Sequence, residues 1–160
     1  MFIEALNFVN KEMPDQPFLA VILGSHQGRK VYKKKLLRLV EQYRLNNHIQ
    51  FIDKCELMPL AYKISDIIVS ASTKPESFGR VAVEAQSMEK PIIASNIGGS
   101  NETIIDNKTG FLFNSGNAKS LCEKILKVLN LNDTSLKSIG IEGRKNIINK
   151  FNVEKMCFST

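Results

Sequence analysis

Continuous apolar runs alternate along this chain with stretches in which apolar residues recur every three or four positions. Residues 18–23 and 91–94 are runs of the first kind, typical of a parallel strand that is buried on both faces. The spacing within 2–9 and 31–44 is of the second kind and predicts helices. The whole pattern predicts strands at 18–23, 49–52, 66–70, 91–95 and 111–113, and helices at 2–9, 31–44, 56–65, 80–88, 101–105, 118–129 and 134–151.

Strands that alternate with helices at this rhythm predict an α/β fold built on a doubly wound parallel sheet. The 160 residues, 43% of them hydrophobic, suffice to bury the core of one such domain. We therefore expect a single lobe over residues 1–160. No run approaches the roughly 20 apolar residues that span a membrane.

The most informative loop holds two carboxylates, Glu76 and Glu84, on either side of a Phe78-Gly79 pair. It follows the 66–70 strand and leads into a helix, which is where α/β proteins bind ligands. The start of a helix suits a phosphate, and Glu84 lies about one turn in, roughly 6–8 Å along the axis. We interpret the two acids as ligands for sugar hydroxyls on either side of a diphosphate, as in a nucleotide sugar. Two alternatives stay open: Glu84 could be a solvated surface residue, and Glu76 could cap the helix.

The net charge of +6 is compatible with an anionic substrate, an anionic membrane or nucleic acid. Seventeen of the 22 basic residues are lysines, so much of the charge reflects a lysine-rich composition. The run at 30–35 is either a solvated helix face or a contact with an anionic membrane surface. No basic face is interleaved with aromatic residues, which argues against nucleic acid as a partner.

The cysteines are three in number and widely spaced, without a CxxC pair, as expected in a reducing compartment. The first residues do not resemble a signal peptide, since Glu4 interrupts the apolar start. We expect a cytoplasmic protein, with a peripheral contact at the inner face of the membrane as a further possibility. His26 and His48 have no partner at metal-ligand spacing, so we expect neither a metal nor another cofactor.

Over residues 76–110 the chain resembles the C-terminal, donor-binding lobe of retaining glycosyltransferases of family 4, also called group 1, which have the two-lobed GT-B architecture. The family pattern combines an acid before Phe-Gly, a Glu-Ala pair, a Gly-Gly turn and an Asp-x-x-x-Gly turn. These elements read here, in the same order, as Glu76-Ser77-Phe78-Gly79, Glu84-Ala85, Gly98-Gly99-Ser100-Asn101-Glu102 and Asp106-Asn107-Lys108-Thr109-Gly110.

The resemblance implies a role for each matching residue. Glu76 would be the catalytic residue that holds hydroxyls of the transferred sugar, and Glu84 would hold the ribose diol. The backbone amides that would meet the sugar and the diphosphate belong to Phe78, Gly79, Arg80 and Val81. Phe51 and Asp53 would flank the base, and Gly24 would line the same edge of the sheet.

The beginning of the chain departs from the family pattern. The family's donor lobe opens with a strand that ends in Gly-Arg, followed by a Lys, and only the next helix is matched here, at residues 2–6. We therefore expect an N-terminally truncated lobe that lacks its first strand, the Arg/Lys pair and the acceptor lobe. Because that strand is central in the doubly wound order, the strands at 18–23 and 66–70 should lack their shared neighbour.

The implied function is the transfer of a hexosyl group from a nucleotide sugar to a carbohydrate or lipid-linked acceptor, with retention of configuration. Synthesis of cell-surface polysaccharide or lipopolysaccharide is the expected setting. A separate acceptor lobe would be needed for transfer, because the isolated chain is expected to be incomplete. The alternative is a truncated or split-gene remnant, a module that binds a nucleotide sugar but is inactive on its own.

Overall fold

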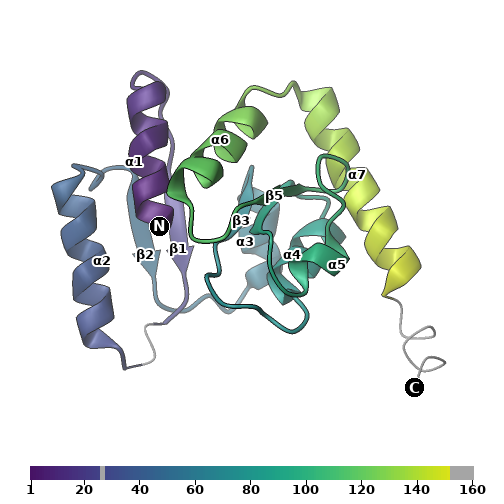
Figure 1. Ribbon diagram of the computed structural model, residues 1–160, viewed down its shortest axis with the longest axis horizontal. Coiled ribbons are helices and arrows are strands. Elements are labelled where there is room, and N and C mark those ends of the chain that lie inside the picture. The colour runs from purple at the N-terminus through teal and green to yellow at the C-terminus, as the bar shows by residue number, and fades with distance from the viewer. Residues whose placement is uncertain (26–27, 152–160) are drawn as a thin grey trace. The chain divides into compact units, whose positions relative to one another are not determined.

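The computed structural model describes residues 1–25 and 28–151 of the chain (Figure 1). Contacts between residues divide the chain into two compact units, Met1–Met58 and Pro59–Thr160. All the helices and strands predicted from the hydropathy pattern are present, with bounds within a few residues of those expected.

The first unit contains two helices and a two-stranded sheet. Its elements are α1 (Phe2–Glu12), β1 (Ala20–Leu23), α2 (Lys30–Gln42) and β2 (Ile49–Ile52). β1 pairs in parallel with β2, with Ala20 opposite Ile49 and Leu23 opposite Ile52. The buried apolar side chains of this unit come from both helices and from β2 and the turn before it: Ile3, Ala5, Leu6, Val9, Val40, Leu45 and Ile49.

The prediction that the 18–23 strand is buried on both faces is wrong. Along β1 the exposure alternates, so that Ala20 and Ile22 are half-buried while Val21 and Leu23 are exposed. Successive side chains of a strand point to opposite faces. Only the face that bears Ala20 and Ile22 is partly covered, and a continuous apolar run cannot reveal this in advance.

The second unit is a three-stranded parallel sheet with helices. Its elements are α3 (Met58–Ile64, beginning at the last residue of the first unit), β3 (Ile68–Ser70), α4 (Arg80–Ser87), β4 (Ile92–Ser95), α5 (Ser100–Thr103), β5 (Phe111–Phe113), α6 (Ala118–Leu129) and α7 (Asp133–Lys150). The strand order is β3-β4-β5, and every pair is parallel. The central strand β4 is buried along its whole length.

Parallel pairing confirms the predicted α/β fold. Among the described residues, β1 has β2 as its only strand partner and β3 has only β4. The two strands that were expected to lack a shared neighbour therefore do lack one in this structure.

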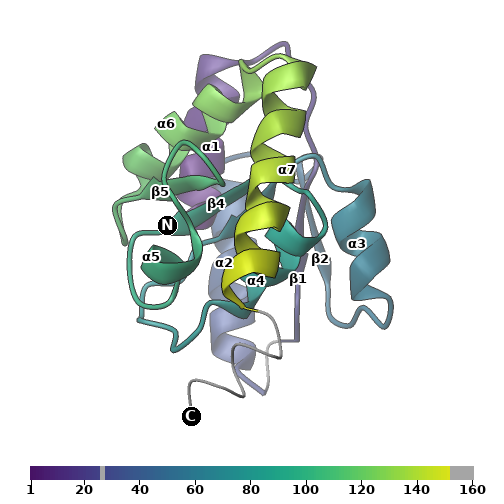
Figure 2. The same cartoon turned by 90° about the vertical axis from the view of Figure 1, so that its right-hand side faces the viewer.

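Two glycines of α7 let this helix lie directly against α4 (Figure 2). A Cβ atom at Gly140 would lie 2.1 Å from the carbonyl oxygen of Glu89, just beyond the end of α4. At Gly143 it would lie 3.1 Å from Cγ of Gln86. The Gln86 amide is itself buried and donates to the carbonyl groups of Ala82 and Thr103 at 3.1 and 3.0 Å. These contacts hold α4 against α7 and against the end of α5.

The turn at 106–110 is held by its own side chains. Oδ1 of Asp106 accepts a hydrogen bond from the Leu112 amide at 2.8 Å, and the Thr109 hydroxyl accepts one from the Ile105 amide at 2.8 Å. Asn107 adopts a left-handed conformation with φ 63°, as expected for Asn in a tight turn. The turn thereby fixes the start of β5.

The close packing of α7 on α4 predicts that Gly140→Ala destabilises the chain. Alanine is favoured over glycine in a helix by about 1 kcal/mol, but here its Cβ overlaps backbone atoms of Glu89. We expect a net loss of about 1–3 kcal/mol in the free energy of unfolding, measured by urea denaturation. Ser138→Ala, at an exposed position of the same helix, is the control and should change stability little. A Gly140→Ala variant as stable as the control would contradict the packing described.

Candidate functional site

The helix α4 begins without a side-chain cap. Its N-terminal boundary residue is Gly79, in a left-handed conformation (φ 68°, ψ 50°) that suits glycine. The Gly79 carbonyl accepts from the amides of Ala82 and Val83 at 2.9 and 3.3 Å. The amides of Arg80 and Val81 donate to no acceptor among the residues that the structure describes. These two N–H groups, with the positive end of the helix dipole, can bind an anion.

The loop that leads into α4 is supported by Gly98 and Gly99. A Cβ atom at Gly98 would lie 2.5 Å from the Glu76 carbonyl oxygen, and one at Gly99 would lie 2.5 Å from the Phe78 carbonyl carbon. The Gly99 amide also donates to the Glu76 carbonyl at 2.8 Å. The sequence suggests only a turn at this glycine pair, whereas the structure makes it the surface on which the 76–78 backbone rests.

Glu76 is exposed on this loop, and its carboxylate does not cap α4. Its Oε1 accepts a hydrogen bond from the Ser72 hydroxyl. Ser72 is in turn contacted by Ser115, whose hydroxyl donates to the Ser72 carbonyl at 3.4 Å. The helix-capping alternative is thus not supported, and the Glu76 carboxylate retains acceptor capacity for another ligand.

Glu84 lies one helical turn beyond the start of α4 and has two side-chain partners within the described part of the chain. The Tyr62 hydroxyl donates to Oε2 at 2.7 Å, and Nη2 of Arg80 lies 3.3 Å from Oε1. Tyr62 is 5% exposed, and the Glu84 side chain is 38% exposed. Burial raises the pKa of the Tyr62 phenol, and its hydrogen bond to the Glu84 carboxylate raises it further. Glu84 is therefore not simply a solvated residue.

Sequence reasoning missed Tyr62. It lies on α3, 22 positions before Glu84, and a tyrosine in an amphipathic helix gives no signal for such a contact. A buried phenol does require a polar partner, but which partner it finds depends on tertiary structure.

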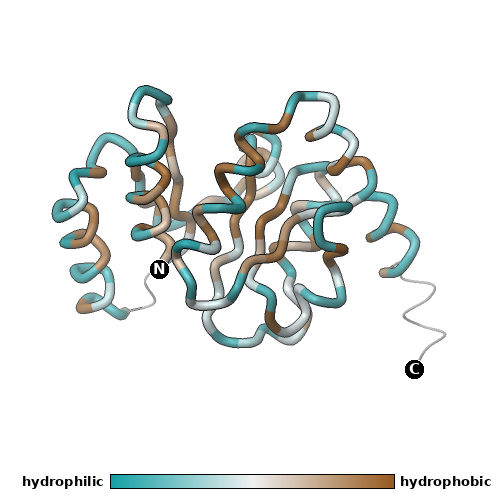
Figure 3. The backbone as a smooth tube through the Cα atoms, turned by 45° about the horizontal axis from the view of Figure 1, so that its top comes forward, coloured by the Kyte–Doolittle hydropathy of each residue, from teal (hydrophilic) through white to brown (hydrophobic). Residues whose placement is uncertain are grey.

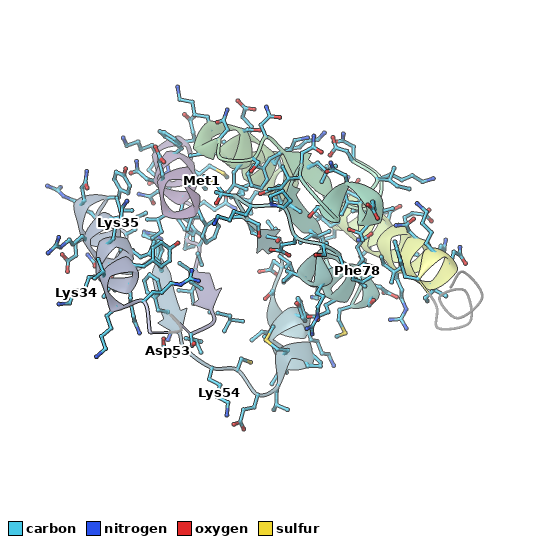
Figure 4. The ribbon with its side chains drawn as sticks, turned by 60° about the horizontal axis from the view of Figure 1, so that its bottom comes forward. Met1, Lys34, Lys35, Asp53, Lys54 and Phe78 are labelled. Atoms are coloured by element: carbon cyan, nitrogen blue, oxygen red, sulfur yellow. The ribbon has the colours of Figure 1, made fainter. Side chains whose placement is uncertain are left out.

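Phe78 lies in the loop before α4 (Figure 4) and packs against the end of α7. Its ring meets the ring of Phe151 edge to face, with centroids 5.4 Å apart and an interplanar angle of 82°. The loop is therefore held by an aromatic contact as well as by the glycine pair.

The remaining predicted residues, Gly24, Phe51 and Asp53, belong to the first unit. Gly24 directly follows β1, has φ 131°, and its amide donates to the Ile52 carbonyl at 3.0 Å. Phe51 is half-buried within β2, opposite Ile22. The Asp53 carboxylate lies just beyond β2 (Figure 4) and accepts from the Lys33 ammonium at 2.9 and 3.1 Å.

Within residues 1–25 and 28–151, no group of three or more His, Cys, Asp or Glu side chains is placed to hold a metal ion. His26, for which the sequence offers no partner at metal-ligand spacing, lies outside the described residues. In the same described part of the chain, none of the helices combines the length and the apolarity needed to cross a membrane.

A family model for "Glycosyl transferases group 1" matches residues 1–146. The capsular polysaccharide biosynthesis glycosyltransferase CapM of Staphylococcus aureus is 44% identical to the chain over 80 residues, which is 49% of this chain and 20% of that protein. A glycosyltransferase structure from Rickettsia africae superposes with a TM-score of 0.88 at 34% identity, over 99% of this chain and 41% of the other. The Anabaena protein HepE, in complex with UDP-glucose, gives a TM-score of 0.88 at 26% identity, over 99% of this chain and 42% of the other.

The family model and the superposed structures match nearly all of this chain, and each relative is matched over only part of its own length. The chain spans 20%, 35% and 27% of the length of the first three curated relatives. The family match includes the loop, the helix α4 and both acidic residues described above. The resemblance inferred from the sequence is thereby confirmed, and the chain belongs to the group 1 glycosyltransferases.

Proposed function

We propose that the loop before α4 and the first turn of this helix bind a nucleotide-sugar donor for glycosyl transfer. The observation that carries the proposal is the uncapped start of α4, with the Glu84 carboxylate held one turn beyond it. The amides of Arg80 and Val81 would bind the diphosphate, together with the backbone of Phe78 and Gly79. Support comes from the structures of HepE in complex with UDP-glucose and with UDP.

The two carboxylates would have separate tasks in this proposal. Glu84 accepts hydrogen bonds from the ribose diol, since the only described partner of its Oε1 is the exposed Arg80 side chain. Glu76 accepts hydrogen bonds from hydroxyls of the transferred sugar and is the proposed catalytic residue. Neither acid would face the diphosphate directly, because a carboxylate is repelled by phosphate.

The chemistry follows from where charge develops. As the bond between the sugar and the diphosphate breaks, negative charge grows on the leaving diphosphate. The N–H groups at the start of α4 and the positive end of its dipole would stabilise this charge, as oxyanion-hole donors do. We propose that these groups act without a metal and that the anomeric configuration is retained.

The proposal also covers the acceptor and the biosynthetic setting. We propose a carbohydrate or lipid-linked acceptor in the synthesis of cell-surface polysaccharide, because CapM, which matches half of this chain, is named for capsular polysaccharide biosynthesis. A separate acceptor lobe would position the nucleophile. The assignment of Gly24, Phe51 and Asp53 to the nucleoside remains a prediction from the family resemblance.

The proposal of a membrane contact is based on the helix α2. Hydrophilic and hydrophobic stretches follow one another along this helix, at the left of Figure 3. Lys34, Lys35 and Arg38 lie on its exposed side and form no ion pair with any described residue. We propose that this face meets the anionic inner surface of the membrane in the cytoplasm.

The proposed donor site predicts different losses at the two acidic positions. Glu84→Ala should weaken UDP and UDP-sugar binding alike, by about 10- to 150-fold, because a charged acceptor for the ribose is removed. Glu76→Ala should weaken UDP-sugar binding while leaving UDP binding nearly unchanged. Calorimetric titration of each variant with UDP and UDP-glucose measures both effects.

Glu123→Ala is the matched control, because this glutamate is exposed on α6, outside the proposed site. It should bind both compounds like the unaltered chain. Negligible effects at both Glu76 and Glu84 would rule out the site assignment. ADP- and GDP-glucose serve as parallel probes, since the base is not part of the prediction.

The membrane proposal predicts that charge reversal on α2 reduces binding to anionic vesicles. Each lysine near such a surface contributes about 1 kcal/mol, so Lys34→Glu with Lys35→Glu should weaken binding by about 10-fold or more. Co-sedimentation with vesicles that contain phosphatidylglycerol measures this. The control is the double variant Lys119→Glu with Lys137→Glu, which changes the net charge equally at exposed positions of α6 and α7. It should bind the vesicles more tightly than the α2 variant. Equal losses in both variants would show that only the net charge matters.

A further inference from the structure

The Tyr62–Glu84 hydrogen bond joins two helices within the second unit. Tyr62 lies near the end of α3, and its ring is buried. Its hydroxyl group is 2.7 Å from Oε2 of Glu84, which projects from the first turns of α4. A carboxylate that accepts from a buried phenol cannot rotate freely, because rotation would leave the phenol without a partner at a substantial energetic cost.

The two oxygens of the Glu84 carboxylate therefore have unequal surroundings. Oε2 is held by a buried donor, whereas among the residues that the structure describes Oε1 has only the Arg80 guanidinium, 3.3 Å away. The Arg80 side chain is 83% exposed, and an exposed ion pair of this kind contributes little. Oε1 is thus the oxygen that a ligand hydroxyl can reach with little displacement of the protein.

We propose that Tyr62 is a positioning residue for ribose recognition: by holding Oε2, it orients the Glu84 carboxylate so that Oε1 accepts from the ribose diol. This proposal rests on the proposed donor site. It makes the affinity for a ribonucleotide depend on Tyr62, a residue outside both the loop and α4. Tyr62 does not touch the nucleotide. Tyr62 restricts the rotation of the Glu84 side chain before the nucleotide binds, so less conformational entropy is lost on binding.

A purely structural role for the hydrogen bond makes a different prediction. If Tyr62 only ties α3 to α4, Tyr62→Phe would affect every nucleotide equally. If it orients Glu84, the loss is confined to nucleotides that present ribose hydroxyls. A nucleotide without those hydroxyls, 2′,3′-dideoxy-UDP, separates the two cases.

The test is calorimetric titration of the full chain with UDP and with 2′,3′-dideoxy-UDP. Tyr62→Phe keeps the ring and removes the hydroxyl group, and it should weaken UDP binding by about 3- to 10-fold. Binding of the dideoxy nucleotide should stay unchanged. In a Glu84→Ala background, Tyr62→Phe should have no further effect on UDP. Tyr32→Phe, the same substitution at an exposed tyrosine of α2, is the control and should bind UDP like the unaltered chain.

Three outcomes would overturn the proposal for Tyr62 alone: unchanged UDP affinity in Tyr62→Phe, equal losses for both nucleotides, or a full additional loss in the Glu84→Ala background. Failure of the proposed function looks different. In that case Glu84→Ala itself would leave UDP affinity unchanged, or the unaltered chain would bind none of UDP, ADP and GDP. Those results would overturn the donor site, and the role of Tyr62 with it.

Discussion

The close approach between the Gly98-Gly99 backbone and the loop at 76–78 is the constraint on which the candidate site depends. No side chain fits at either glycine, because a Cβ atom would lie 2.5 Å from backbone atoms of the loop. The Gly99 amide adds a hydrogen bond to the Glu76 carbonyl. With the loop fixed in this way, Gly79 can take its left-handed conformation and α4 can begin with two amides that have no partner among the described residues. The proposed binding of an anion rests on this backbone arrangement and requires no cluster of basic side chains.

The arrangement also explains how two acidic residues can lie beside a site for an anion. Glu76 accepts from Ser72, and Glu84 accepts from Tyr62 and lies beside Arg80. Each carboxylate is thus oriented by a neighbouring hydroxyl group. In the proposed site, backbone donors would bind phosphate and carboxylate acceptors would bind hydroxyl groups. A nucleotide sugar carries both kinds of group in this order.

Much of the fold could be predicted from the sequence, because hydropathy periodicity is a local property. The strands β2 and β5 have the predicted bounds, and the helix of the key motif begins at Arg80 as expected. Three features could not be predicted, because each depends on atoms that are distant in the sequence. The exposure of Val21 and Leu23 depends on what covers one face of β1. The need for glycine at positions 98 and 99 depends on the path of the loop at 76–78, which lies at least 20 residues earlier in the sequence. The contact between Tyr62 and Glu84 joins two separate helices.

The most direct test of the donor site is an amide NMR titration of the chain with UDP. We expect the largest shifts at Phe78, Gly79, Arg80 and Val81, because their amides would meet the diphosphate. Smaller shifts are expected along α6, which lies outside the proposed site. Shifts that leave residues 78–81 unchanged, or that are largest elsewhere in the second unit, would contradict the claim that the start of α4 binds the nucleotide.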